Sequence, residues 1–250
     1  MPRKQVHEII LAATPGEVWR MITEAENITR WFSPEARVEP GKGGKIFLSW
    51  GPGMEGEAPI HLWEPNHRFG WTEPGDSPKL IEFEIEAQGG LTKLRLVQSG
   101  FGEGASFDDE FESVNGGWLS FLSILKYGIE FHRLDACTPV SVFRNVELTR
   151  DQITASIGTA IQVSPLLGQL AAGQPYQAQL GALGPVHGTR LEPFKPGYYV
   201  LTLDSWNQSI LAIFAEQADR NCYFTMQAYL FGDSGKNARQ LKTLLTELTL

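Results

Sequence analysis

Cysteine is scarce in this sequence, which has only Cys137 and Cys222 among its 250 residues. Two cysteines so far apart provide neither the framework of a disulfide-rich domain nor a spaced ligand set for zinc. The five histidines show no metal-binding pattern such as H-E-x-x-H, so no metal site is expected. We expect these histidines at surface or turn positions: His7, His61, His67, His132 and His187.

Long apolar runs are also missing from the sequence. No stretch approaches the roughly 18 apolar residues that a helix needs to cross a bilayer. The first residues, 1–5, read MPRKQ and lack the apolar run of about 7 to 15 residues that a secretion signal requires. The sequence therefore predicts a cytoplasmic protein without membrane insertion.

Two glycine-containing stretches lack the features of known catalytic loops. Residues 41–44 lack the spacing and the following Ser or Thr of a phosphate-binding loop. Residues 99–102 lack the G-x-S-x-G arrangement that presents a nucleophilic serine. The sequence therefore predicts no cofactor and no catalytic residue.

Positive charge is in deficit, and the formal net charge is −8. Residues 1–135 hold 13 Lys and Arg against 21 Asp and Glu, whereas residues 136–250 hold 8 of each kind. An acidic surface repels a phosphate backbone, so no nucleic acid is expected as a partner. Because the whole excess lies in the first half, we expect two units with different surfaces.

The first half opens with the signals of a strand and a capped helix. Residues 4–12 are sufficiently apolar and β-branched for a strand. The sequence TPGE at 14–17 has the form of a capping box, in which Thr14 caps free backbone N–H groups and Glu17 reaches back to the cap. A helix is predicted to follow, and then a second short helix over about residues 25–31.

Strand and turn signals fill residues 37–97, and the clearest is a hairpin from Leu80 to Val97 around Gly89-Gly90. A pair of glycines is typical of a tight hairpin turn. The resulting register opposes Glu86 to Lys93, Glu84 to Arg95, Ile85 to Leu94 and Phe83 to Leu96. One face is therefore apolar and the other carries opposite charges, and a shift of one residue would destroy both patterns.

A long helix is predicted next, with Ser106 as its N-cap and the acidic residues 108–110 at the positive end of the helix dipole. Its apolar residues recur at spacings of three and four: Phe107, Phe111, Val114, Trp118, Phe121, Leu122, Leu125 and Ile129. Gly116-Gly117 interrupts the helix at a cost of roughly 1 kcal/mol per glycine relative to alanine. That cost implies a close backbone approach to the sheet or room for a ligand.

The second half repeats this order of elements. Residues 141–148 alternate like a strand, and residues 149–152 form another capping-box pattern that opens a helix to about Ile161. Asp233 or Ser234 is expected to cap a final helix that ends near Glu247. Five strand signals lie in between, over residues 176–180, 186–191, 198–203, 210–215 and 222–231. The repeated order predicts a second sheet with its own helix, and the alternative is one large domain with a single extended sheet.

Two groups of residues resemble a known family. The first is TPGEVW at 14–19 with ITRWF at 28–32, and the second is Gly117-Trp118-Leu119 continued through Leu122, Leu125 and Glu130. Both look like signatures of the homologues of the heat-shock-protein-90 ATPase activator, within the START-like (SRPBCC) helix-grip superfamily. The resemblance covers residues 1–135 and implies a curved antiparallel sheet wrapped around a long C-terminal helix.

The second half, residues 139–250, matches neither signature and is interpreted as a degenerate second copy from its element order alone. The predicted fold is therefore α+β, with two tandem helix-grip domains. In the first domain the fold implies an apolar cavity between helix and sheet, which suits a small hydrophobic ligand. The candidate ligand-binding residues are Phe69, Trp71, Phe83, Trp118 and Leu122. Core packing is the more common role for any single large aromatic residue.

Three functions are consistent with these patterns. The leading prediction is a non-catalytic protein that binds a small apolar ligand in the first domain, with the second domain as a structural companion. The resemblance also implies a co-chaperone-like module that binds a chaperone or another protein. The third is a cyclase or hydratase in which a carboxylate at the cavity mouth is the general base. The clustered acids are Glu55, Glu57 and residues 108–110, and their loop and helix-terminal positions favour a solvated role.

Overall fold

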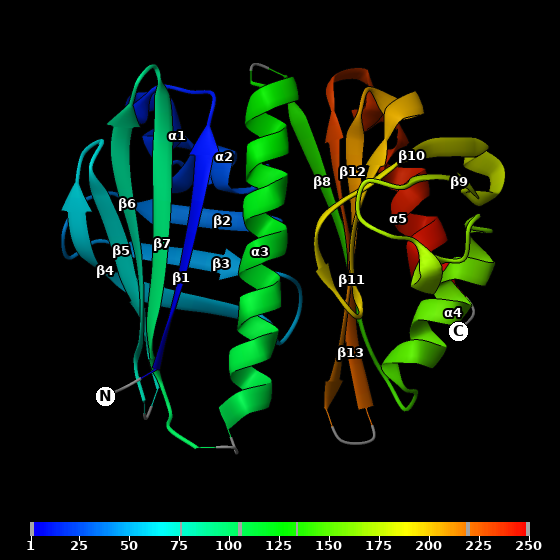
Figure 1. Cartoon of the computed structure of the whole chain (residues 1–250), viewed down its shortest axis with the longest axis horizontal. Coiled ribbons are helices and arrows are strands. Elements are labelled where there is room, and N and C mark those ends of the chain that lie inside the picture. Colours follow the sequence, from blue (N-terminus) through cyan, green and yellow to red (C-terminus); the bar gives the residue numbers. More distant parts are fainter. Residues whose placement is uncertain (1–2, 76, 105–106, 134, 219–220, 249–250) are drawn as a thin grey trace. The chain divides into compact units, whose positions relative to one another are not determined.

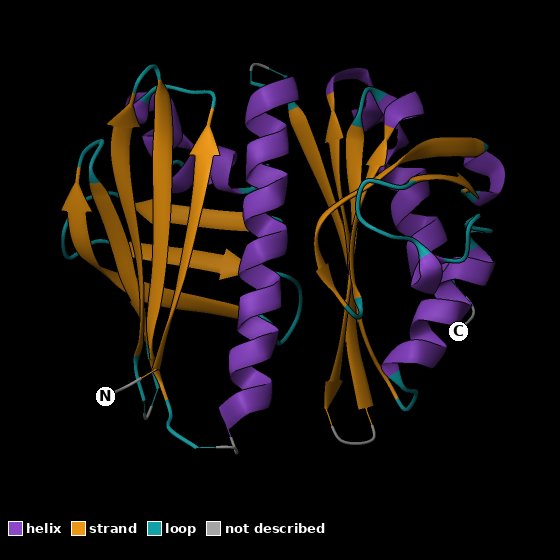
Figure 2. Ribbon diagram, viewed as in Figure 1, coloured by secondary structure: helices purple, strands orange, loops and turns teal. Residues whose placement is uncertain are grey.

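The computed structural model describes residues 3–75, 77–104, 107–133, 135–218 and 221–248. The chain forms two compact units, residues 1–133 and 134–250, each with its own antiparallel sheet (Figure 1; Figure 2). Within the described residues no strand of one sheet pairs with a strand of the other. The predicted α+β fold with two tandem domains is confirmed, and the alternative of one extended sheet is wrong.

The first unit contains a seven-stranded sheet with the order β1-β7-β6-β5-β4-β3-β2. The first strand pairs with the last, and the remaining strands follow as an antiparallel meander. The elements are β1 (Arg3–Leu11), α1 (Pro15–Thr23), α2 (Ala25–Ile28), β2 (Glu35–Glu39), β3 (Lys45–Ser49), β4 (Glu55–Glu64), β5 (Arg68–Glu73), β6 (Lys79–Gln88), β7 (Leu91–Phe101) and α3 (Asp108–Phe131).

The capping box at the start of α1 forms as predicted. The Thr14 hydroxyl accepts from the Glu17 backbone N–H at 3.3 Å, and the Glu17 carboxylate accepts from the Thr14 N–H at 2.7 Å. These bonds satisfy donors that the first helical turn leaves unpaired. The short helix α2 ends at Ile28, three residues before its predicted end.

The hairpin β6–β7 has the predicted register, so the prediction is confirmed. Glu86 lies opposite Lys93 and Glu84 opposite Arg95, with ion-pair distances of 2.5 and 2.6 Å. Both turn glycines have a positive φ, 57° at Gly89 and 88° at Gly90, a backbone conformation that residues other than glycine rarely adopt. The apolar face of the hairpin therefore points into the unit and the charged face outward.

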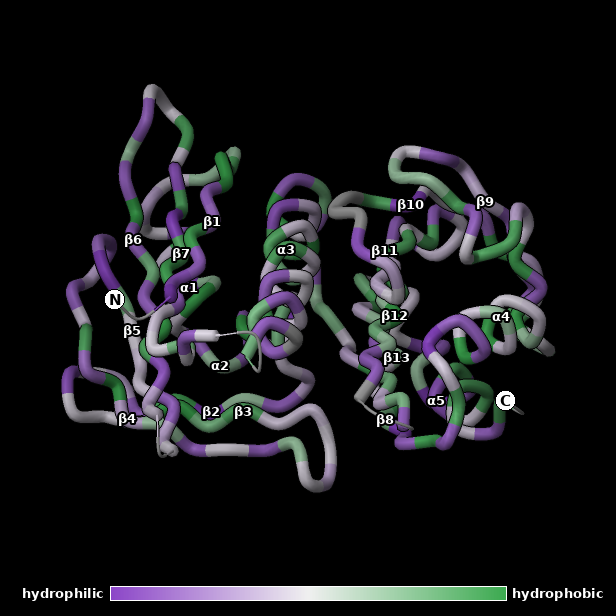
Figure 3. The backbone as a smooth tube through the Cα atoms, turned by 60° about the horizontal axis from the view of Figure 1, so that its bottom comes forward, coloured by the Kyte–Doolittle hydropathy of each residue, from purple (hydrophilic) through white to green (hydrophobic). Residues whose placement is uncertain are grey.

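Helix α3 packs against β1 along the inner side of the first sheet (Figure 1). Its apolar stripe is buried at Trp118, Leu122, Leu125 and Ile129, and Figure 3 shows hydrophobic and hydrophilic residues alternating along the helix. The predicted cap Ser106 lies outside the described residues. A Cβ added at Gly117 would meet no atom within 4 Å, so close packing does not explain this glycine.

The second unit repeats the strand topology with one strand fewer. Its sheet has the order β8-β13-β12-β11-β10-β9, so again the first strand pairs with the last. The elements are β8 (Cys137–Val146), α4 (Arg150–Ala160), β9 (Pro175–Gln179), β10 (Pro185–Lys195), β11 (Tyr198–Leu203), β12 (Ser209–Ala218), β13 (Asn221–Phe231) and α5 (Ala238–Glu247).

Helices α4 and α5 cover one face of the second sheet and share its core. Ile153 and Ile157 of α4 and Leu241 and Leu245 of α5 are fully buried in that cluster. The capping box at Thr149 forms as predicted, with Gln152 as its reciprocal partner. Helix α5 begins four residues later than Ser234, because residues 232–237 form a 3-10 helix. No helix within the described ranges combines the length and the apolar character of a membrane span.

Candidate functional site

The five predicted ligand-binding residues lie together inside the first unit. Phe69 and Trp71 come from β5, Phe83 from β6, and Trp118 and Leu122 from α3, and each is at most 6% exposed. The ring centroids are 5.5 Å apart for Phe69 and Trp71, 5.9 Å for Trp71 and Phe83, and 6.0 Å for Phe83 and Trp118. These side chains form one contiguous aromatic cluster that joins the sheet to the helix.

The cluster extends into the segment after α2, where the sequence reasoning missed Phe32 as a site residue. Phe32 stacks on Trp118 with centroids 5.0 Å apart and meets Phe121 edge-on at 4.9 Å. Trp31 meets Phe83 edge-on at 6.5 Å. Both aromatics belong to the ITRWF stretch, so the signal for a contact with the long helix was present in the sequence.

Polar side chains also face α3 from the sheet, and the sequence analysis did not single them out. Gln5 and His7 on β1 and Gln98 on β7 are 4%, 8% and 3% exposed. The Trp118 indole N–H donates to Gln98 Oε1, and Gln5 Nε2 donates to the Phe111 carbonyl on α3. Alternation along β1 was the available signal, because Gln5 and His7 occupy inward-facing positions of that strand.

Two atoms of this polar set have no hydrogen-bond partner among the described residues, namely Gln5 Oε1 and His7 Nε2. Because the amide nitrogen of Gln5 donates to the Phe111 carbonyl, the unpaired atom of this side chain is its acceptor oxygen. Burial lowers the pKa of His7, which favours the neutral imidazole. An unpaired buried polar atom costs about 1–3 kcal/mol, so a group that pairs with these atoms would be stabilising.

Three of the clustered acids of the enzyme hypothesis, Glu55, Glu57 and Asp108, lie on the surface. The Glu57 carboxylate pairs with Lys45 at 2.7 Å, and the Asp108 carboxylate pairs with Arg3 at 2.5 Å. Glu55 is exposed as well. Exposed ion pairs contribute about 0–1 kcal/mol. These carboxylates are therefore solvated surface groups, and none of them is a general base beside the aromatic cluster.

Two of the five histidines are buried, contrary to the predicted surface positions. His7 is 8% exposed and His132 is 3% exposed. His7 points inward because side chains alternate along β1, and His132 lies at the C-terminal end of α3. The composition of the sequence reveals neither placement. The His61 ring lies 3.2 Å from the Glu82 carboxylate and 3.0 Å from the Thr72 hydroxyl. Across the described part of the chain, no group of His, Cys, Asp and Glu is placed to hold a metal ion.

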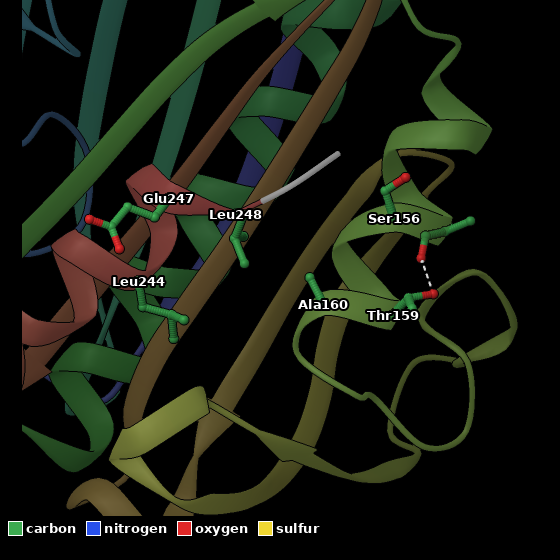
Figure 4. Close-up of a pocket in the computed structure, with 7 residues that line it drawn as sticks. Ser156, Thr159, Ala160, Leu244, Glu247 and Leu248 are labelled. Atoms are coloured by element: carbon green, nitrogen blue, oxygen red, sulfur yellow. Dashed lines mark hydrogen bonds between the residues drawn. The ribbon is translucent and has the colours of Figure 1, made fainter.

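Surface pockets occur elsewhere in both units. In the first unit a pocket of about 760 Å³ lies beside Trp19 and Trp63, whose centroids are 5.1 Å apart. In the second unit a pocket of about 660 Å³ lies between α4 and α5 (Figure 4). The residues drawn there include Ser156, Thr159, Ala160, Leu244, Glu247 and Leu248. The predicted ligand-binding residues line neither pocket.

The first unit matches the model of a known family. Residues 12–129 match the profile of the family described as Activator of Hsp90 ATPase homolog 1-like protein. The resemblance inferred from the two signatures is therefore confirmed for the first half. A search of curated proteins found no match.

Solved structures similar to the chain include an Aha1 dimer from Colwellia psychrerythraea, at 22% identity and TM-score 0.46 over 51% of this chain and 96% of that one. CalU16 from Micromonospora echinospora is 26% identical, with TM-score 0.41, over 50% of this chain and 74% of that one. DynU16, from the dynemicin biosynthetic locus, is 13% identical, with TM-score 0.46, over 97% of this chain and 93% of that one.

Proposed function

Because residues 12–129 carry the sequence pattern of the Activator of Hsp90 ATPase homolog 1-like family, we propose that the first unit is a non-catalytic binding module. Its ligand is a small apolar molecule held between α3 and the inner face of the sheet, in a cytoplasmic protein. The observation that supports this most directly is the pair of unpaired polar atoms, Gln5 Oε1 and His7 Nε2, in an interior that is mostly apolar and aromatic.

The aromatic cluster supports the apolar part of the ligand. Phe69, Trp71 and Phe83 present rings from the sheet, and Trp118 presents its ring from α3. A ligand inserted beside these rings would replace ring–ring contacts with ring–ligand contacts of similar strength. Pockets lined by aromatic side chains with a few placed polar groups are the usual sites for small organic molecules.

The polar atoms define the rest of the ligand. Gln5 and His7 stand two residues apart on the same face of β1, which places their Cα atoms about 7 Å apart. A hydroxyl group can donate to Gln5 Oε1 and can also pair with the neutral His7 ring. The proposed ligand therefore has an apolar body and one hydroxyl group.

The experiment compares 2-naphthol with 2-methylnaphthalene, which has similar size but no hydroxyl group. Each is titrated into the full chain while the tryptophan fluorescence is followed, because Trp118 and Trp71 lie in the cluster. We expect 2-naphthol to bind about two- to tenfold more tightly, since one neutral hydrogen bond contributes about 0.5–1.5 kcal/mol.

The preference for the hydroxyl compound should disappear in Gln5→Met, which keeps the side-chain length and removes the acceptor. Gln227→Met is the matched control, because Gln227 is an equally buried amide in the second unit. Equal affinity of both compounds for the unmodified protein, or failure of both to bind, contradicts the proposal. A preference that survives Gln5→Met contradicts the assigned polar contact.

A second candidate function follows from the description of the family, which names an activator of the Hsp90 ATPase. In that case the first unit binds a chaperone of this kind and raises its rate of ATP hydrolysis. The test adds the purified full chain to a purified Hsp90 and measures phosphate release. A concentration-dependent increase supports this function, and an unchanged rate at saturating protein excludes it.

A further inference from the structure

The surface pocket of about 760 Å³ in the first unit lies between the helices α1 and α2 and the strands β2 and β4. Trp19 lines it from α1, Val38 from β2 and Trp63 from β4. The volume lies in the range of pockets that hold small organic ligands. The sequence analysis placed Trp19 in a family signature and did not predict a ligand beside it.

Two tryptophan rings form a corner in the wall of this pocket. The ring planes of Trp19 and Trp63 are 78° apart, and their centroids are separated by 5.1 Å. Both rings also meet the buried Phe69 ring edge-on, at 6.3 and 5.6 Å, which holds them in place from the interior. Because both tryptophans are only half-buried, part of each ring is accessible. In a corner between perpendicular rings a cation can contact two ring faces, and tryptophan attracts cations most strongly of the aromatic side chains.

The pocket also has a negatively charged rim. Among the described residues that line it, the charged ones are Glu24 and Glu26, and both are exposed. The Glu24 carboxylate accepts from the neutral Asn27 amide at 2.7 Å, and this bond leaves the charge of the carboxylate in place. Carboxylates in this position attract a cation and repel an anion. The rim and the tryptophan corner therefore favour the same sign of charge in a ligand.

The uncharged part of the wall indicates which kind of cation fits. The Thr23 hydroxyl is buried and donates to the Trp19 carbonyl at 2.7 Å, and the side chains of Ala25, Val38 and Pro40 are apolar. A primary ammonium group has three N–H donors that need acceptors. A quaternary ammonium group has no N–H donor, so it loses fewer hydrogen bonds when it leaves water for such a wall.

We propose that this pocket binds a small quaternary ammonium compound. The methyl groups on its nitrogen contact the rings of Trp19 and Trp63, and the carboxylates of Glu24 and Glu26 balance its charge. A free cation suits the site better than a phosphate ester of the same cation, because the rim repels the phosphate. Trp19 and Trp63 do not belong to the ligand site proposed above, so this inference does not rest on that function.

The test compares choline with 3,3-dimethylbutan-1-ol, in which an uncharged carbon replaces the nitrogen. Each is titrated into the full chain with isotope-labelled tryptophan, and the indole N–H signals are followed by NMR. The signals of Trp19 and Trp63 are assigned from their loss in Trp19→Phe and Trp63→Phe. We expect choline to shift both signals and to bind about fivefold more tightly than the alcohol, or better, because only choline is a cation. Equal affinities, or no shift of these two signals with choline, would overturn the proposal.

Phosphocholine distinguishes a free cation from the head group of a phospholipid. We expect it to bind more weakly than choline, and tighter binding of phosphocholine would contradict the assignment to a free cation.

Variants of the rim and of the corner locate the binding. Glu24→Gln combined with Glu26→Gln should weaken choline about threefold or more and leave the alcohol unaffected. Glu55→Gln combined with Glu57→Gln is the matched control, because it changes the net charge equally at exposed positions outside the pocket. Trp63→Leu should reduce the preference for choline about twofold or more through loss of one ring. An unchanged choline affinity in the rim variant, or an equal loss in the control, overturns the assignment whether or not Trp63→Leu folds.

Discussion

Trp118 joins α3 to the first sheet through two kinds of contact. Its ring stacks with Phe32 and meets Phe83 edge-on, and its indole N–H donates to Gln98. We expect Trp118→Ala to lower the free energy of unfolding by about 3–5 kcal/mol, because truncation leaves a cavity and an unpaired acceptor. Urea denaturation measures the change. Leu119→Ala, at the next and 36% exposed position, is the control, and a loss below about 1 kcal/mol for Trp118→Ala contradicts the packing described.

Because His7 is buried, we expect the free energy of unfolding to depend on pH. Burial lowers its pKa in the folded chain below the value of about 6.5 that histidine has when unfolded. As the pH falls through about 6.5, the unfolded chain takes up a proton before the folded chain does, so the free energy of unfolding decreases. The slope approaches about 1.4 kcal/mol per pH unit while only the unfolded form is protonated.

The measurement compares the free energy of unfolding at pH 7.0 and about pH 5.5 for the unmodified protein and for His7→Gln. We expect the unmodified protein to lose more stability on acidification than the variant. His187→Gln changes an exposed histidine and should behave as the unmodified protein does. The same loss in the unmodified protein and in His7→Gln would show that His7 does not carry this pH dependence.

Among the helices and strands, α3 contains a glycine, Gly117, that the packing around the helix does not require. A Cβ at Gly117 meets no atom within 4 Å, so Gly117→Ala should raise the free energy of unfolding by up to about 1 kcal/mol through helix propensity. The opposite result is expected for Gly188→Ala on β10, where the added Cβ would lie 1.8 Å from the Thr202 carbonyl oxygen. Thermal denaturation of both variants measures the difference, and a destabilised Gly117→Ala would show that space beside α3 matters.

Local signals predicted the elements well wherever the pattern extended over several residues. The Gly89-Gly90 hairpin was predicted in its correct register because charged and apolar pairs both depend on it. The capping boxes at Thr14 and Thr149 were predicted because their bonds join residues three positions apart. The start of α5 was predicted four residues early, because Ser234 instead donates its hydroxyl to the distant Trp206 carbonyl.

At the scale of the whole molecule, each unit has a complete sheet and its own helices. We therefore expect a protein of residues 1–133 to fold and to unfold cooperatively in urea, with near-ultraviolet circular dichroism from its tryptophan cluster. A shorter protein of residues 1–104 lacks α3 and should have neither property, since the inner face of its sheet is uncovered. Non-cooperative unfolding of the 1–133 protein would contradict the independence of the first unit.

The sequence by itself determined the division into two halves, the order of their elements and the aromatic side of the first sheet. These features follow from periodicity and from turn and cap residues, which act over a few positions along the chain. Only the tertiary structure decided that Gln5 and His7 face α3 with unpaired atoms and that Trp19 and Trp63 line one pocket. Such sites join residues that lie far apart in the sequence, and their burial and pairing depend on which elements pack together.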